Sequence, residues 1–74
     1  MTLDKVCKGE AVTILQINDT KVRQQAIRLG IYEGARFVCN EKISGGPVVL
    51  QGAYNTTAIG GRLSEKIIVE LAQD

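Results

Sequence analysis

The sequence predicts a mainly β fold, a small five-stranded barrel with one short helix, on three observations. Five short segments are rich in β-branched and other apolar residues, which favour strands. Only one segment has clear helical periodicity, with Val22, Ala26 and Leu29 at i, i+4 and i+7. Glycines stand at nearly every corner, and short strands joined by tight turns satisfy their edges most simply by closing into a barrel. The expected strands are Ala11–Ile17, Ala35–Cys39, Val48–Leu50, Thr57–Ile59 and Ile67–Leu71.

The expected helix runs from about Lys21 to Leu29. Three polar residues precede its apolar stripe, and any of them can accept hydrogen bonds from the free amides of the first turn: Asn18, Asp19 and Thr20. Gly30 follows the stripe, at the position where a left-handed glycine ends many helices. Gly34 makes a second turn before the next strand. We therefore expect a helix of about two and a half turns that leads directly into a strand.

The other connections are expected to be tight. The first strand, Ala11–Ile17, has apolar residues on both faces, so alternation does not say which face is buried. The polar residues 40–42 stand outside the expected second strand, and Pro47 can begin the third because a first position need not donate to the ladder. Turns or single helical turns are expected at Leu3 to Cys7, Ser44 to Pro47, Gly52 to Asn55, Gly60 to Gly61 and Arg62 to Lys66.

The composition indicates one small globular domain, residues 1–74. Hydrophobic residues make up 45% of the 74 residues, which argues against disorder. The core must be built mainly from Val, Ile, Leu and Ala, because only Tyr32, Phe37 and Tyr54 are aromatic. No secretory pattern opens the chain, and no apolar run approaches the roughly 18 residues that cross a bilayer. We therefore expect a cytoplasmic protein without membrane insertion, whose two cysteines are unlinked and mostly buried thiols.

The charge is small but unevenly distributed. A net charge of +1 argues against a protein that binds mainly through phosphate backbones. The segment from Lys21 to Arg36 carries a local charge of +3, and the rest of the chain sums to −2. The sequence therefore predicts one basic face on an otherwise nearly neutral module.

An ordered set of residues along almost the whole chain resembles the FeoA family of small SH3-like barrels, which are associated with bacterial ferrous iron uptake. The matching positions are Gly9, Ile14, Ile17, Arg23, Leu29-Gly30-Ile31, Gly34, Gly46-Pro47, Ile59 and Ile68-Val69. The resemblance implies a cytoplasmic accessory protein that contacts the cytoplasmic GTPase region of a FeoB-type membrane iron transporter and modulates it. The same barrel occurs as the C-terminal domain of some metal-dependent repressors. This chain departs from commoner members at Cys7, Cys39 and Gly60-Gly61.

The residues do not favour a metal centre, a cofactor or catalysis. The chain has no histidine, and Cys7 and Cys39 are not at metal-clip spacing, so core packing is the expected role of Cys39. We expect no stoichiometric metal and no enzymatic activity, since no nucleophile, base and orienting group can be assembled from scattered acids. The glycine pairs at 45–46 and 60–61 fit neither phosphate-loop pattern and are expected to make turns.

A partner-binding surface is expected on the helix and the residues around it. Its candidate residues are Arg23, Ile27, Arg28, Tyr32 and Tyr54. Arginines beside an apolar anchor often concentrate binding energy. The plainer interpretation is a solvated helix face with Ile27 packed against a neighbouring strand. Tyr54 is open to two interpretations as well, an extension of the surface or a core residue with its hydroxyl at the rim.

Two functions of different classes remain open at this point. The first is a protein-interaction module for the FeoB-type transporter, acting as a monomer or weak homo-oligomer. The second is a nucleic-acid-binding small barrel, against which stand the near-zero net charge and the lack of an aromatic stacking surface. Salt dependence separates the two, because backbone-driven binding to nucleic acid weakens steeply with salt.

Overall fold

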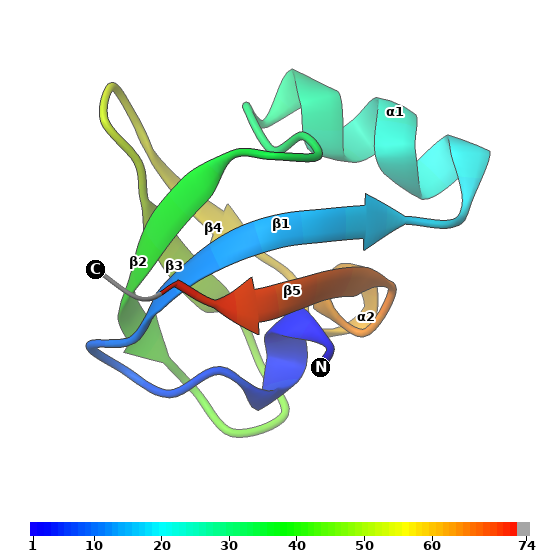
Figure 1. Cartoon of the computed structure of the whole chain (residues 1–74). Helices are drawn as coiled ribbons and strands as arrows, with labels where there is room; N and C mark the ends of the chain where they lie inside the picture. Colours follow the sequence, from blue (N-terminus) through cyan, green and yellow to red (C-terminus); the bar gives the residue numbers. More distant parts are fainter. Residues whose placement is uncertain (73–74) are drawn as a thin grey trace.

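The computed structural model describes residues 1–72 and shows one strongly bent antiparallel sheet with a helix packed at one end (Figure 1). The five strands follow the spatial order β4-β3-β2-β1-β5. The elements are η1 (Leu3–Lys5), β1 (Ala11–Ile17), α1 (Thr20–Arg28), β2 (Arg36–Lys42), β3 (Val48–Gln51), β4 (Thr56–Ile59), α2 (Gly61–Ser64) and β5 (Ile67–Leu71). The mainly β, SH3-like fold with five strands that the sequence predicts is confirmed.

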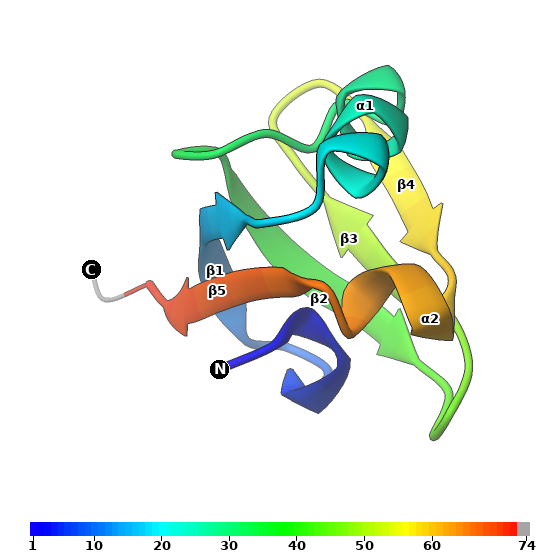
Figure 2. The same ribbon diagram turned by 90° about the vertical axis from the view of Figure 1, so that its right-hand side faces the viewer.

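The sheet is nevertheless not closed. Within residues 1–72 no ladder joins β4 to β5, and the chain between them turns through α2. The outer edge of β5 is occupied instead by the start of the chain, where the Val69 amide donates to the Met1 carbonyl at 2.8 Å and the Met1 amino group donates to the Val69 carbonyl at 3.1 Å. The start of the chain, and not β4, therefore covers part of the β5 edge. Figure 2 shows α2 beside the gap between β4 and β5.

Bulges interrupt the alternation in two strands: β1 keeps its predicted bounds, and β2 continues beyond its predicted end to Lys42. In β1, the register against β5 shifts between Ile14 and Gln16, so Ile14 and Ile17 are both buried although they are three residues apart. This irregularity is why apolar residues stand on both faces of the strand in the sequence. In β2, the register against β3 shifts between Cys39 and Glu41, and the polar residues 40–42 continue the strand instead of leaving it.

The core is aliphatic, as the composition requires. Phe37 is its one aromatic member among residues 1–72, and the other buried apolar residues are Leu3, Val6, Val12, Ile14, Ile17, Val22, Ala26, Ile31, Ala35, Cys39, Val48, Leu50, Ile59, Ile67 and Val69. The expected burial of Cys39 is confirmed, but Cys7 is exposed and the expectation for it is wrong. Cys7 lies in the turn between η1 and β1, outside the sheet, where no element covers it.

Helix α1 begins at one of the three N-cap candidates in the sequence and ends at the glycine that the sequence predicts. Asp19 is the N-cap residue, and its Oδ1 accepts from the Lys21 amide at 2.9 Å and the Val22 amide at 3.2 Å. At the other end, the Gly30 amide donates to the Ile27 carbonyl and the Ile31 amide to the Ala26 carbonyl, which is a Schellman motif. Gly30 has φ +81°, and an added Cβ there would lie 2.6 Å from Asn55 Nδ2. Gly30 is therefore required both by its φ and by close packing.

Replacing the N-cap, Asp19→Ala, is expected to lower the Tm by a few degrees at pH 7, because two amides lose their acceptor. The hydrogen bond from the Val22 amide is the main reason that the pKa of Asp19 lies below its ordinary value of 3.8. A lowered pKa in the folded state means that the stabilisation is present above the unfolded pKa and is lost as the pH falls through the folded one. Thermal denaturation at several pH values checks this. A Tm difference that persists at pH 2 would contradict it.

Candidate partner-binding surface

Helix α1 turns one face to the core and leaves the candidate residues on the outside. Val22 and Ala26 are buried, whereas Ile27 and Arg28 are exposed, and the side chain of Ile27 keeps 56% of its accessible surface. Ile27 is therefore not packed against a neighbouring strand. Leu29, expected on the core stripe, keeps 38% exposure because the helix ends at this residue and its backbone turns away.

Arg23 has a structural role that sequence reasoning missed. Its Nη2 donates to the Ile17 carbonyl at 3.0 Å and to Glu33 Oε2 at 3.4 Å. The same Glu33 oxygen accepts from the Ile17 amide at 3.1 Å. Arg23 and Glu33 therefore join the end of β1, the first half of α1 and the turn before β2. The only signal in the sequence is the opposite charge of two residues ten positions apart, which is too weak to predict a contact.

The contact also changes the electrostatics of the surface. Arg23 and Glu33 form an ion pair whose side chains keep 49% and 43% of their surface exposed, so the pair is screened and its net stabilisation is small. Its effect is to offset the charge of Arg23 locally. Arg28, in the last turn of α1, has no side-chain hydrogen bond or ion pair with residues 1–72 and remains the full cation of the outer face. A cation there also interacts favourably with the negative end of the helix dipole.

Tyr32 and Tyr54 are brought together by the tertiary structure. Both line a cleft of about 450 Å³ between the turn that follows α1 and the β3–β4 turn, with Ala35 and Phe37 also in its lining. Tyr32 keeps 56% exposure and Tyr54 keeps 99%. Tyr54 is thus not a core residue, because it stands at the tip of the hairpin turn with no element above it.

Close packing fixes the position of the β3–β4 turn. The Leu29 carbonyl, left free at the end of α1, accepts from Thr57 Oγ1 at 3.0 Å and from Asn55 Nδ2 at 3.3 Å. On the other side, a Cβ added to Gly52 would lie 2.8 Å from the Phe37 ring. The turn that carries Tyr54 is thereby held between the helix end and the core. The five candidate residues do not form one compact cluster: Arg23 faces the end of β1, and the two tyrosines lie beyond the other end of α1.

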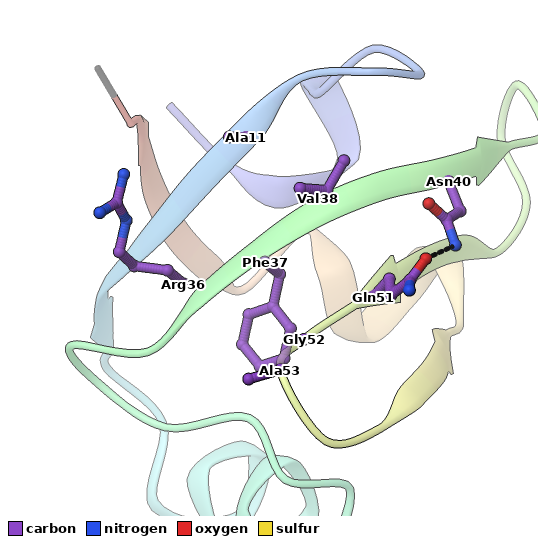
Figure 3. Close-up of a pocket in the computed structure, with 8 residues that line it drawn as sticks. All are labelled: Ala11, Arg36, Phe37, Val38, Asn40, Gln51, Gly52 and Ala53. Carbon is purple, nitrogen blue, oxygen red and sulfur yellow. Dashed lines mark hydrogen bonds between the residues drawn. The ribbon is translucent and has the colours of Figure 1, made fainter. Parts of the chain in front are cut away.

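A second hollow of about 580 Å³ lies on the neighbouring side of the β3–β4 turn (Figure 3). Phe37 points towards Gly52 and Ala53, and Arg36 extends at the opposite end. Asn40 Nδ2 donates to Gln51 Oε1 at 2.6 Å across β2 and β3. No carboxylate, imidazole or thiol is among the described residues that line this hollow, so its chemistry is that of a contact surface rather than of a proton-transfer site.

The cysteines do not form a metal centre with other ligands in the described part of the chain. No group of three or more His, Cys, Asp or Glu residues within 1–72 is arranged to hold a metal ion. Cys39 is buried, and burial raises the pKa of its thiol, which keeps the weaker-binding protonated form at neutral pH. The sulfur lies 3.5 Å from the Glu41 carbonyl, to which the thiol donates. The described helices are all too short and too polar to cross a bilayer.

Several solved structures share this architecture. A crystal structure described as the iron uptake regulatory protein FeoA is similar over 97% of each chain, with a TM-score of 0.88 and 22% identity. An NMR structure of a FeoA-like protein from Clostridium acetobutylicum covers 100% of this chain and 88% of its own, with a TM-score of 0.85 and 21% identity. A manganese-dependent transcriptional repressor has a TM-score of 0.85 and 16% identity, and the match spans 99% of this chain and 41% of the repressor.

At these identities the solved structures show the fold alone. No curated protein is significantly similar to the chain in sequence. The family model of the FeoA domain, however, matches residues 1–71, which is nearly the whole chain. The family consists of small accessory domains and is not a known enzyme family. The chain therefore belongs to the FeoA family, and this membership implies a role in ferrous iron transport.

Proposed function

We propose that this protein binds the cytoplasmic GTPase region of a FeoB-type iron transporter and modulates it through the outer face of α1. The observation that carries the proposal is the exposure of Ile27 beside Arg28 on a helix that contains no acidic residue. An exposed isoleucine flanked by an arginine has the composition of an interface anchor rather than of an ordinary solvated face. Membership of the FeoA family supports an iron-transport context for the partner.

Tyr32 and Tyr54 extend this surface beyond the C-terminal end of α1. Tyrosine supplies a large contact area with few rotatable bonds, and both rings are exposed and held on turns that pack against the core. Arg23 contributes mainly by fixing the turn after α1 through Glu33. Modulation further requires that the protein bind two states of the transporter with different affinities, because equal affinity for both shifts no equilibrium.

The test is a titration of this protein with the isolated cytoplasmic GTPase domain of the FeoB-type transporter from the same organism, in its GDP-bound and GTP-analogue-bound states. We expect binding with different affinities for the two states. Arg28→Glu is expected to weaken binding by roughly tenfold, because it reverses the charge of the exposed cation beside Ile27.

Lys8→Glu is the matched control, since Lys8 is exposed and its side chain forms no hydrogen bond or ion pair with residues 1–72. Lys8 belongs to the turn before β1, and this turn lies at the opposite end of β1 from α1 (Figure 1). Equal losses of affinity for Arg28→Glu and Lys8→Glu would show that binding depends on the net charge of the protein and not on the position of Arg28. The absence of binding in both nucleotide states would reject the proposed partner.

A further inference from the structure

A groove of about 570 Å³ lies between residues of α1 and residues of α2. Figure 2 shows α2 beside the opening left by the unclosed sheet. The groove is lined by Val22, Gln25, Gly60, Gly61, Arg62, Leu63 and Lys66. None of the residues proposed for the transporter contact lines this groove. Gln25 and Ile27, two positions apart on α1, point to opposite flanks of the helix, whereas Gln25 and Arg28 are neighbours at i and i+3, so the two surfaces adjoin near Arg28. Val22 and Leu63 supply an apolar base, and Arg62 and Lys66 supply two positive charges. No described residue that lines the groove is acidic.

The positive charge of the groove is only partly offset by the protein itself. Lys66 Nζ lies 3.9 Å from Asp19 Oδ2, and this contact spans from the start of β5 to the start of α1. Arg62 is exposed, and its side chain forms no hydrogen bond or ion pair with residues 1–72. This contrasts with Arg23, whose guanidinium is held by Glu33 and a carbonyl. The groove therefore combines an apolar base with a guanidinium available for a carboxylate.

The groove contains two glycines, and close packing accounts for only one of them. A Cβ added to Gly61 would lie 3.0 Å from the Gly45 carbonyl oxygen, so close packing accounts for its small size. Gly60 has φ −61° and ψ 154°, which any residue adopts, and an added Cβ would meet nothing within 4 Å. Neither backbone conformation nor packing requires glycine at position 60. A Cβ can therefore be introduced at position 60 without a clash.

We infer that this groove binds an acidic protein segment that carries a leucine-sized apolar side chain. The apolar side chain packs on Val22 and Leu63, and the flanking carboxylates pair with Arg62 and Lys66. Charge complementarity selects an acidic partner, and the apolar base separates this site from a purely electrostatic one. The inference does not rest on the proposed transporter or on the outer face of α1.

The probe is an acetylated and amidated peptide of sequence Glu-Leu-Glu-Glu-Leu-Glu, titrated into the isotopically labelled protein and followed by amide chemical shifts. We expect saturable shifts centred on the amides of Gln25, Arg62 and Leu63. A peptide with lysine in place of glutamate is expected not to bind. The absence of shifts up to about 1 mM peptide would overturn the inference. Shifts centred on Tyr32 and Tyr54 would overturn it too.

Position 60 allows a charge-reversal test at constant bulk. Gly60→Glu is expected to weaken peptide binding by about tenfold, whereas Gly60→Lys is expected to leave it unchanged or tighten it, because the two side chains differ mainly in the sign of their charge. Equal losses from both variants would show that the side chain blocks the groove without regard to charge, and would overturn the acidic specificity. Arg62→Ala provides a second measurement and is also expected to weaken peptide binding.

Two further measurements distinguish this groove from the transporter contact and from a membrane-binding surface. Ile27→Glu is expected to leave peptide binding intact, so that failure of the proposed transporter contact and failure of this site are distinguishable. Vesicles of phosphatidylcholine with about one third phosphatidylserine, added at low salt, are expected not to sediment the protein. The inference would be overturned if the wild-type protein sedimented with the vesicles, Gly60→Glu abolished this sedimentation, and the peptide did not bind. The groove would then be assigned to a membrane surface.

Discussion

Ala26→Glu is expected to unfold the protein at 25 °C and pH 7. Ala26 is fully buried on α1 and packs in the aliphatic core. A carboxylate there would lie among the apolar side chains of the core, and an unpaired charge in a core costs on the order of several kcal/mol. A domain of this length has a free energy of unfolding of roughly 4–11 kcal/mol, so the substitution removes most or all of it.

Loss of amide chemical-shift dispersion and of the cooperative thermal transition would show the effect of Ala26→Glu. Burial favours the neutral acid and so raises the pKa of a glutamate at position 26 above its ordinary value of about 4.3. The destabilisation should therefore decrease as the pH falls towards about 4.3 and should change no further below that pH, where the folded and unfolded states are both protonated. A dispersed spectrum with a Tm within a few degrees of the wild type would contradict the burial of Ala26. The matched control is Ile27→Glu, which places a glutamate at the next position of α1, where the side chain is exposed.

Ile27→Glu is expected to keep the fold and to lose binding to the GTPase domain. The side chain of Ile27 already keeps 56% of its surface in contact with water, so a carboxylate there needs no partner within the protein. At the centre of an interface, loss of an apolar anchor costs about 2 kcal/mol, which is roughly a thirtyfold loss of affinity. The new charge adds desolvation to this cost.

Calorimetric titration with the GTPase domain measures the loss, and the Tm of Ile27→Glu is expected to stay within a few degrees of the wild type. Unchanged affinity would place the docking surface elsewhere, with the cleft of Tyr32 and Tyr54 as the next surface to test. Unfolding of Ile27→Glu would show that Ile27 is packed in solution. Arg23→Glu is a poor substitute for this test, because it also opposes Glu33 and releases the Ile17 carbonyl.

Sequence and structure agree best where short-range interactions decide the outcome. The helix of α1 follows from the spacing of Val22 and Ala26, the Asp19 cap and the left-handed Gly30, all within twelve residues. The strands follow from runs of β-branched residues between glycines. β1 and β5 have the predicted bounds because a turn or break lies directly on either side of each.

In β2 the predicted and observed bounds differ. The bulge between Cys39 and Glu41 lets β2 continue through polar residues, because cross-strand hydrogen bonds to β3 depend on the partner rather than on the apolar alternation. Closure of the barrel likewise depends on which segments pair, and not on the apolar alternation within a strand. Whether β4 meets β5 is decided by what already occupies the β5 edge, and residues at the opposite end of the sequence occupy it.

The candidate site shows the same division. The sequence alone determined that α1 is basic and that Ile27 lies off its core stripe, because helical periodicity assigns each residue to a face. Only the tertiary structure decided that Arg23 is tied to Glu33, that Tyr32 and Tyr54 line one cleft, and that a cationic groove opens between α1 and α2. These arrangements join segments that are distant in sequence, and local spacing carries no information about which distant segments the fold brings together.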